Sequence, residues 1–80
     1  MGFFTPAWQQ YDQQKAENAV NAAVTKDDQK KLARIACEAV SEYVRVTAVN
    51  ALKDQPLIQR IAATDAKEIV REKAVSRITD

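Results

Sequence analysis

The chain has 80 residues, enough for one small domain, with 46% hydrophobic residues, 29% charged residues and a net charge of +1. This near-neutral charge argues against a strong non-specific nucleic-acid binder, which is usually clearly basic. The chain has no histidine, which excludes a Cys–His catalytic pair, and no apolar run long enough to span a membrane.

The N-terminal quarter predicts one helix after a short arm. The opening residues lack the basic region and long apolar stretch of a secretory signal. Thr5 and Pro6 are typical of a helix start, with Thr as the N-cap and Pro as the first helical residue. We expect this helix to run to about Val24, and we assign residues 1–27 to an N-terminal arm and a capping helix, which covers the apolar side of the segment that follows.

Residues 28–53 and 54–79 align without a gap when Asp28 is placed on Asp54. Ten pairs are identical and no gap is needed, which is more than chance similarity would give and indicates a true internal repeat. The identical pairs are Asp28/Asp54, Gln29/Gln55, Arg34/Arg60, Ile35/Ile61, Ala36/Ala62, Glu42/Glu68, Val44/Val70, Arg45/Arg71, Ala48/Ala74 and Val49/Val75. We therefore expect two units, 28–53 and 54–80, within a single domain covering 1–80.

Within each unit the apolar residues recur at helical rather than strand spacing. This spacing predicts two short helices per unit, at about 29–38 and 42–52 and again at about 55–63 and 67–78. With the N-terminal helix, the prediction is an all-α fold of five helices. The expected core positions are Leu32, Ile35, Ala36, Ala39, Val44, Ala48, Val49, Leu52, Ile58, Ile61, Ala62, Val70, Ala74, Val75 and Ile78.

Acidic residues mark the expected helix starts. Asp28 and Asp54 each precede a first helix, where a carboxylate caps free N–H groups. Asp65 followed three residues later by Glu68 is typical of a capping box for the last helix. Ala39 stands at the position of Asp65 in the first unit, so we expect Ser41 to cap that helix, which should begin slightly later.

The pattern VR-x-x-AV-x-x-[LI]-x-D, found at 44–54 and 70–80, resembles the short HEAT-like repeat of small bacterial proteins. This resemblance implies a HEAT-like α-solenoid of two helical hairpins with an N-terminal capping helix, its second helices lining the inner surface. It also implies a structural ladder between units, formed here by Asp65, Arg45 and Arg71. Only part of such a ladder is expected, because the first unit has Ala39 in place of the aspartate.

The outward positions of the second helices are the best candidates for contact with a protein partner. They are Val46, Asn50, Lys53, Glu72, Ser76 and Thr79, and they differ between the units, which also suits a surface under no constraint. Arg45 and Arg71 have a second interpretation as a phosphate or carboxylate clamp, although the ladder is favoured. Arg34 and Arg60, with Lys30 and Lys31, form either a basic ridge or an ordinary solvated face.

We expect a non-enzymatic protein–protein interaction scaffold, because no metal motif, phosphate loop or nucleophile motif is present. The alternatives are an accessory module of a larger enzyme, as in the HEAT-like repeats of bilin lyases, and a weak nucleic-acid binder. No cofactor is expected. The single cysteine, Cys37, suits a reduced, cytoplasmic chain. Val75 and Ile78 have no following unit, so we expect either a longer array or a homodimer through this open end.

Overall fold

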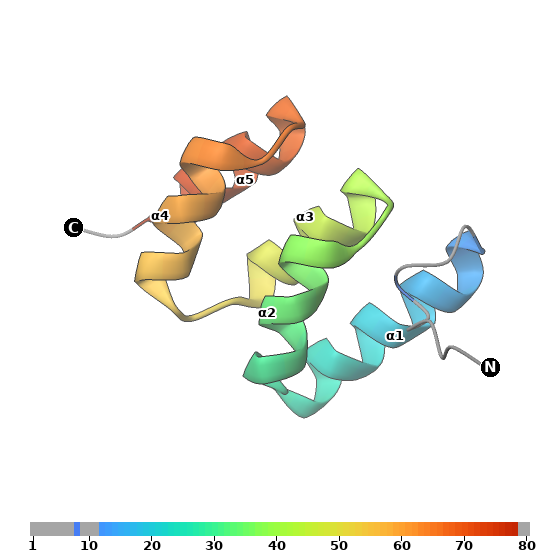
Figure 1. The fold of residues 1–80 in the computed structure, drawn as a ribbon. Coiled ribbons are helices and arrows are strands. Elements are labelled where there is room, and N and C mark those ends of the chain that lie inside the picture. Colours follow the sequence, from blue (N-terminus) through green and yellow to red (C-terminus); the bar gives the residue numbers. More distant parts are fainter. Residues whose placement is uncertain (1–7, 9–11, 79–80) are drawn as a thin grey trace, which may run out of the picture.

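The computed structural model describes Trp8 and residues 12–78. Over these residues the chain forms five α-helices and no strand (Figure 1). The helices are α1 (Gln13–Lys26), α2 (Gln29–Glu38), α3 (Glu42–Ala51), α4 (Gln55–Thr64) and α5 (Glu68–Arg77). The all-α prediction is confirmed, and the four repeat helices lie close to their expected bounds.

The helices pair as two hairpins, α2 with α3 and α4 with α5, and α3 packs along α5. Helix α1 contacts α2 and α3, and it lies at the opposite end of the molecule from α4 and α5 (Figure 1). By contrast, α2 and α4 are not in close contact. The hairpins therefore meet through their second helices and diverge at their first helices.

The two predicted aspartate caps are present. The side chain of Asp28 accepts a hydrogen bond from the N–H of Lys31, and that of Asp54 accepts one from the N–H of Leu57. Ser41 caps α3 as predicted, through a bond from the N–H of Tyr43 to its hydroxyl oxygen. Each bond satisfies an amide that has no partner inside the helix, which stabilises the helix by about 1 kcal/mol.

The predicted capping box at Asp65 is wrong. The N-cap of α5 is Lys67, which makes no side-chain cap bond, and Asp65 is the C-cap of α4. We also expected α3 to begin later in its unit than α5 does, and this is wrong, because Glu42 and Glu68 begin their helices at the same phase of the repeat. The reason is that Ala39 (φ −63°, ψ 140°) and Asp65 (φ −64°, ψ 141°) share one extended backbone conformation, so the turn length does not depend on the side chain.

Helix α1 begins later than Thr5, the expected start. Asp12 has an extended backbone and is the N-cap, its side chain accepting from the N–H of Lys15. The helix then runs to Lys26 and ends at Asp27, which has the left-handed φ of 52° that Asp tolerates better than most residues. Thr5 and Pro6 lie outside the described residues. The start was mispredicted because the Thr-Pro signal precedes a second, stronger cap at Asp12.

Trp8 joins the N-terminal segment to the first hairpin. Its side chain is buried, and its carbonyl oxygen accepts a hydrogen bond from the N–H of Val40 at 3.1 Å. The guanidinium of Arg34 lies over the indole ring, 5.3 Å from its centroid. Such a cation–π contact suits an aromatic side chain that covers one edge of a small core.

The core follows the repeat, with buried residues on both hairpins and on α1. The buried hydrophobic side chains are those of Trp8, Ala16, Val20, Ala23, Leu32, Ile35, Ala36, Ala39, Val44, Ala48, Val49, Leu52, Ile58, Ile61, Val70 and Ala74. Three of the predicted core positions are not fully buried: Ala62 and Ile78 are half-buried, and Val75 is 59% exposed. All three belong to the second hairpin.

Candidate functional site

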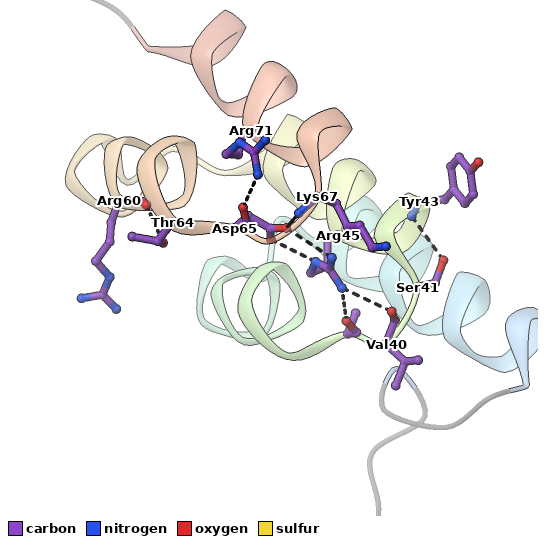
Figure 2. Close-up of polar contacts among 10 residues, drawn as sticks. Val40, Ser41, Tyr43, Arg45, Arg60, Thr64, Asp65, Lys67 and Arg71 are labelled. Atoms are coloured by element: carbon purple, nitrogen blue, oxygen red, sulfur yellow. Dashed lines mark hydrogen bonds and ion pairs between the residues drawn. The ribbon is translucent and has the colours of Figure 1, made fainter.

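A polar network at the turns of the two hairpins centres on Arg45 of α3 (Figure 2). Its guanidinium donates two hydrogen bonds to the carboxylate of Asp65, from Nε to Oδ2 at 3.0 Å and from Nη2 to Oδ1 at 3.2 Å. Nη1 donates to the carbonyl oxygens of Ala39 at 2.7 Å and Val40 at 3.3 Å. The side chains of Arg45 and Asp65 are only 12% and 10% exposed. This bidentate, largely buried ion pair links the first hairpin to the second.

Arg71 repeats one part of this network at the corresponding position of the second hairpin. Its Nη1 donates to the carbonyl oxygen of Asp65 at 2.7 Å, as Arg45 does to that of Ala39. Each hairpin turn is thus bound by an arginine from its own second helix, and Arg45 also binds the next hairpin. Nε, Nη1 and Nη2 of Arg45 each donate to an acceptor within the fold. Arg45 is therefore not available to bind a phosphate or a free carboxylate.

Gln29 and Gln55 close the other end of each hairpin, a role that the sequence analysis did not assign. Nε2 of Gln29 donates to the carbonyl oxygen of Ala51 at 3.0 Å, and Nε2 of Gln55 donates to that of Arg77 at 3.1 Å. Oε1 of Gln29 also accepts from the N–H of Lys53. These amides bind the last carbonyls of α3 and α5, which lack partners within the helix. The available signal was the identity of Gln29 and Gln55 at the same phase.

A groove of about 340 Å³ lies between α3 and α5, lined by Val46, Ile69, Glu72, Lys73 and Ser76. It brings together three of the predicted partner contacts, namely Val46, Glu72 and Ser76. The half-buried Val46 and the 36%-exposed Ile69 supply apolar surface, and Glu72 and Lys73 add one negative and one positive side chain to the lining. Ile69 and Lys73 were missed, because their place beside α3 depends on how the hairpins pack.

The other predicted contacts lie apart from this groove. Asn50 is exposed and does not line the groove. Nζ of Lys53 forms an exposed ion pair with Oδ2 of Asp27 at 2.8 Å, which ties the end of α3 to the end of α1. Hydrogen bonds from Lys53 and then Gln29 lower the pKa of Asp27 below its ordinary value of 3.8. Thr79 lies outside the described residues.

A second cleft, of about 430 Å³, opens where α2 and α4 diverge. Cys37, Arg60 and Thr64 are among its lining residues, and the paired Arg45 and Asp65 also border it. Burial raises the pKa of the Cys37 thiol, an effect that the positive charge of Arg60 partly opposes. A raised pKa leaves less of the reactive thiolate at neutral pH.

The predicted basic ridge is interrupted at its first arginine. Arg34 forms an ion pair with Glu38 at 3.2 Å in addition to its contact with the Trp8 ring. Arg60 is the copy of Arg34, but Thr64 replaces the glutamate one turn later. Lys30 and Lys31 are exposed. The charges of this face are therefore partly neutralised by neighbours on the same helix.

Within residues 12–78 and at Trp8, no group of three or more His, Cys, Asp or Glu side chains is placed to hold a metal ion. No helix in the part of the chain that the structure describes has the length and apolar character needed to cross a membrane. Comparison with known proteins found no matching family model, no matching curated protein and no matching solved structure.

Proposed function

We propose that the chain is a HEAT-like helical-repeat module that binds a protein partner through the groove between α3 and α5. The observation that carries the proposal is this groove, where Val46, Ile69, Glu72, Lys73 and Ser76 meet from two copies of one helix. We further propose that the module is non-enzymatic and works in the cytoplasm, with a binding surface rather than a reaction centre.

The arrangement of the hairpins supports a short α-solenoid. The arginine and glutamine contacts recur at the same phase in both hairpins. The hairpins are close at α3 and α5 and apart at α2 and α4. Hairpins that are closer at their second helices than at their first form a stack that curves toward the second helices. Helices α3 and α5 then line the concave side, which repeat proteins commonly use for binding.

The chemistry of the groove suits a side chain or two from another protein. Val46 and Ile69 offer apolar surface for an aliphatic or aromatic anchor, and Glu72, Lys73 and Ser76 offer one anion, one cation and one hydroxyl at its edge. A volume near 340 Å³ is at the lower end of the range for small-molecule pockets. By contrast, Arg45, Asp65 and Gln29 already bind other parts of the fold.

The proposal is tested with Ser76→Arg, which fills the groove, and with the matched control Gln59→Arg. Gln59 is exposed on α4, lines neither cleft, and its substitution adds the same charge. Affinity capture from cell lysate with quantitative mass spectrometry should recover a protein with the wild-type chain and with Gln59→Arg. Recovery should fall at least about tenfold with Ser76→Arg, the loss expected when a central contact is blocked.

Both variants must show the helical circular dichroism of the wild-type chain. If Ser76→Arg and Gln59→Arg retain the same proteins in equal amounts, the groove is not the binding site. If recovery rises equally with both variants, binding follows the added positive charge and the weak nucleic-acid alternative becomes the better one.

A further inference from the structure

One apolar face of the second hairpin is uncovered, although its copy in the first hairpin is fully buried. Val49 and Leu52, on α3 and at its C-cap, are 0% exposed, whereas the copies are the 59%-exposed Val75 and the half-buried Ile78. Ala62 is half-buried in the same way, and its copy Ala36 is fully buried. The surface formed by Ala62, Val75 and Ile78, with Arg71 beside it, is called here the open face.

The first hairpin shows what covers such a face. There, α5 packs along α3, and the Asp65 carboxylate in the α4–α5 turn binds Nε and Nη2 of Arg45. Arg71 has the same place in the second hairpin, with Nη1 bound to a turn carbonyl. Its Nε and Nη2 bind no carboxylate among the described residues, and Figure 2 shows this guanidinium on the far side of Asp65 from Arg45.

We propose that the open face binds a helical hairpin of a partner protein, whose turn presents an Asp or Glu side chain to Arg71. This hairpin packs an aliphatic helix surface on Val75, Ile78 and Ala62, as α5 packs on α3 of the first hairpin. The carboxylate makes the partner selective, because a buried guanidinium without an anion is costly. The open face is separate from the α3–α5 groove, so this inference does not rest on the proposed function.

A second copy of this chain meets the requirement less well. The surface of α5 that covers the first hairpin is already packed against α3 in each molecule. The carboxylate of Asp65 is already bound by Arg45 and by the N–H of Lys67. In a homodimer that repeats this arrangement, Asp65 of the second copy could reach Arg71 only by releasing its own Arg45.

The experiment adds the required hairpin to the 80-residue chain. A copy of residues 54–80 is joined in phase after Thr79, so that the turn of the added hairpin carries an aspartate at the position equivalent to Asp65. In a Cys37→Ala background, Val75→Cys reports coverage of the open face through its rate of maleimide labelling. Asn50→Cys is the matched control, because Asn50 is exposed and lies on α3, in the first hairpin.

Labelling at position 75 should slow at least about tenfold in the extended chain, and labelling at position 50 should not change. Replacing the added aspartate with alanine should restore at least half of the lost rate at position 75. Unchanged labelling at position 75, in an extended chain whose helical dichroism has increased, would overturn the proposal. So would equal protection with and without the added aspartate.

A photo-crosslinking amino acid at position 75 of the chain without the added hairpin then tests the partner in cells. The expected product joins position 75 to a helical hairpin of another protein with Asp or Glu in its turn. Crosslinking to a second copy of this chain, or to a segment without helix or acidic turn, would overturn the proposal, as would the absence of any product.

Discussion

The two hairpins share ten identical residues, yet they differ in what those residues contribute. Val49 is fully buried and Val75 is 59% exposed, although both stand at the same place on a second helix. Arg45 joins two hairpins, whereas Arg71 binds only the turn of its own hairpin among the described residues. The local sequence determines the contacts inside a hairpin. The neighbouring hairpin determines how much each of these residues contributes to the free energy of unfolding.

The largest difference is expected for charged substitutions at the paired valines. Val49→Asp places an unpaired carboxylate at a 0%-exposed position, which should cost on the order of 4 kcal/mol or more and leave the chain largely unfolded. Val75→Asp changes an exposed position and should lower the free energy of unfolding by no more than about 0.5 kcal/mol. Urea unfolding followed by circular dichroism measures both. Equal losses for the two variants would mean that the open face is covered in the protein as studied.

The paired arginines should differ next. Arg45→Leu leaves the nearly buried carboxylate of Asp65 without its cation, at a cost of about 2–4 kcal/mol in the free energy of unfolding. Arg71→Leu removes a hydrogen bond to a carbonyl oxygen and should cost about 1 kcal/mol. Urea unfolding measures the two free energies.

A control separates the lost ion pair from lost packing. The double variant Arg45→Leu/Asp65→Leu removes the unpaired carboxylate and should recover part of the stability lost in Arg45→Leu. If Arg45→Leu and Arg71→Leu are equally destabilising, the link from Arg45 to Asp65 contributes nothing beyond the turn contact.

The paired caps should behave alike, in contrast to the valines and arginines. Asp28→Ala and Asp54→Ala each remove one side-chain bond to a helix N–H, so each should cost about 1 kcal/mol. Thermal unfolding should show similar decreases in melting temperature for the two variants. Asn substitutions at the same positions are the control, because Asn is also a good cap and should retain most of the stability. A loss confined to one of the two caps would contradict the equivalence of the hairpins.

The smallest effect is expected at the exposed ion pair of Asp27 and Lys53. The repeat aligns position 27 with position 53, so this pair joins two equivalent positions of successive units. Hydrogen bonds from Lys53, and secondly from Gln29, lower the pKa of Asp27 below 3.8. Because the pKa of Asp27 is lower in the folded state, the pair stabilises the fold at pH values above the ordinary pKa of 3.8. This stabilisation is lost as the pH falls through the pKa of the folded state.

Lys53→Ala removes the larger cause, so the pKa of the Asp27 carboxyl should rise toward 3.8. Carbon-detected NMR of the side-chain carboxyl, titrated with acid, measures this shift. Lys30→Ala is the control with the same change in net charge and should leave the Asp27 midpoint in place. Added salt should reduce the difference, because the pair is exposed.

Much of the fold was predictable because its signals are local. The internal repeat, the helical spacing and the caps at Asp28, Asp54 and Ser41 led to helix bounds that agree closely with the structure for α2, α4 and the start of α3 at Glu42. Each signal depends on residues within one or two turns of helix. The start of α1 was mispredicted for the same reason, since two local signals, Thr5 and Asp12, competed in one segment.

The candidate site was only partly predictable. Val46, Glu72 and Ser76 were expected on a binding surface and line the groove, but Lys53 pairs with Asp27, and Ile69 and Lys73 were missed. The groove forms between α3 and α5, which are separated along the chain by the whole of α4 and its two turns, and its lining depends on their relative rotation. The helical pattern specifies the buried face of each helix but leaves the neighbours of its outer face unspecified.

Sequence alone determined that this protein is helical, that its helices pair in two repeated hairpins, and that particular aspartates begin them. These properties arise from backbone propensity, capping and apolar spacing, which act over a few residues. Only the tertiary structure decided that Asp65 is the C-cap of α4 and not the N-cap of α5, and that Val75 stays exposed while Val49 is buried. Two identical residues acquire different energies because burial and ion pairing depend on the neighbouring hairpin, which the local pattern does not contain.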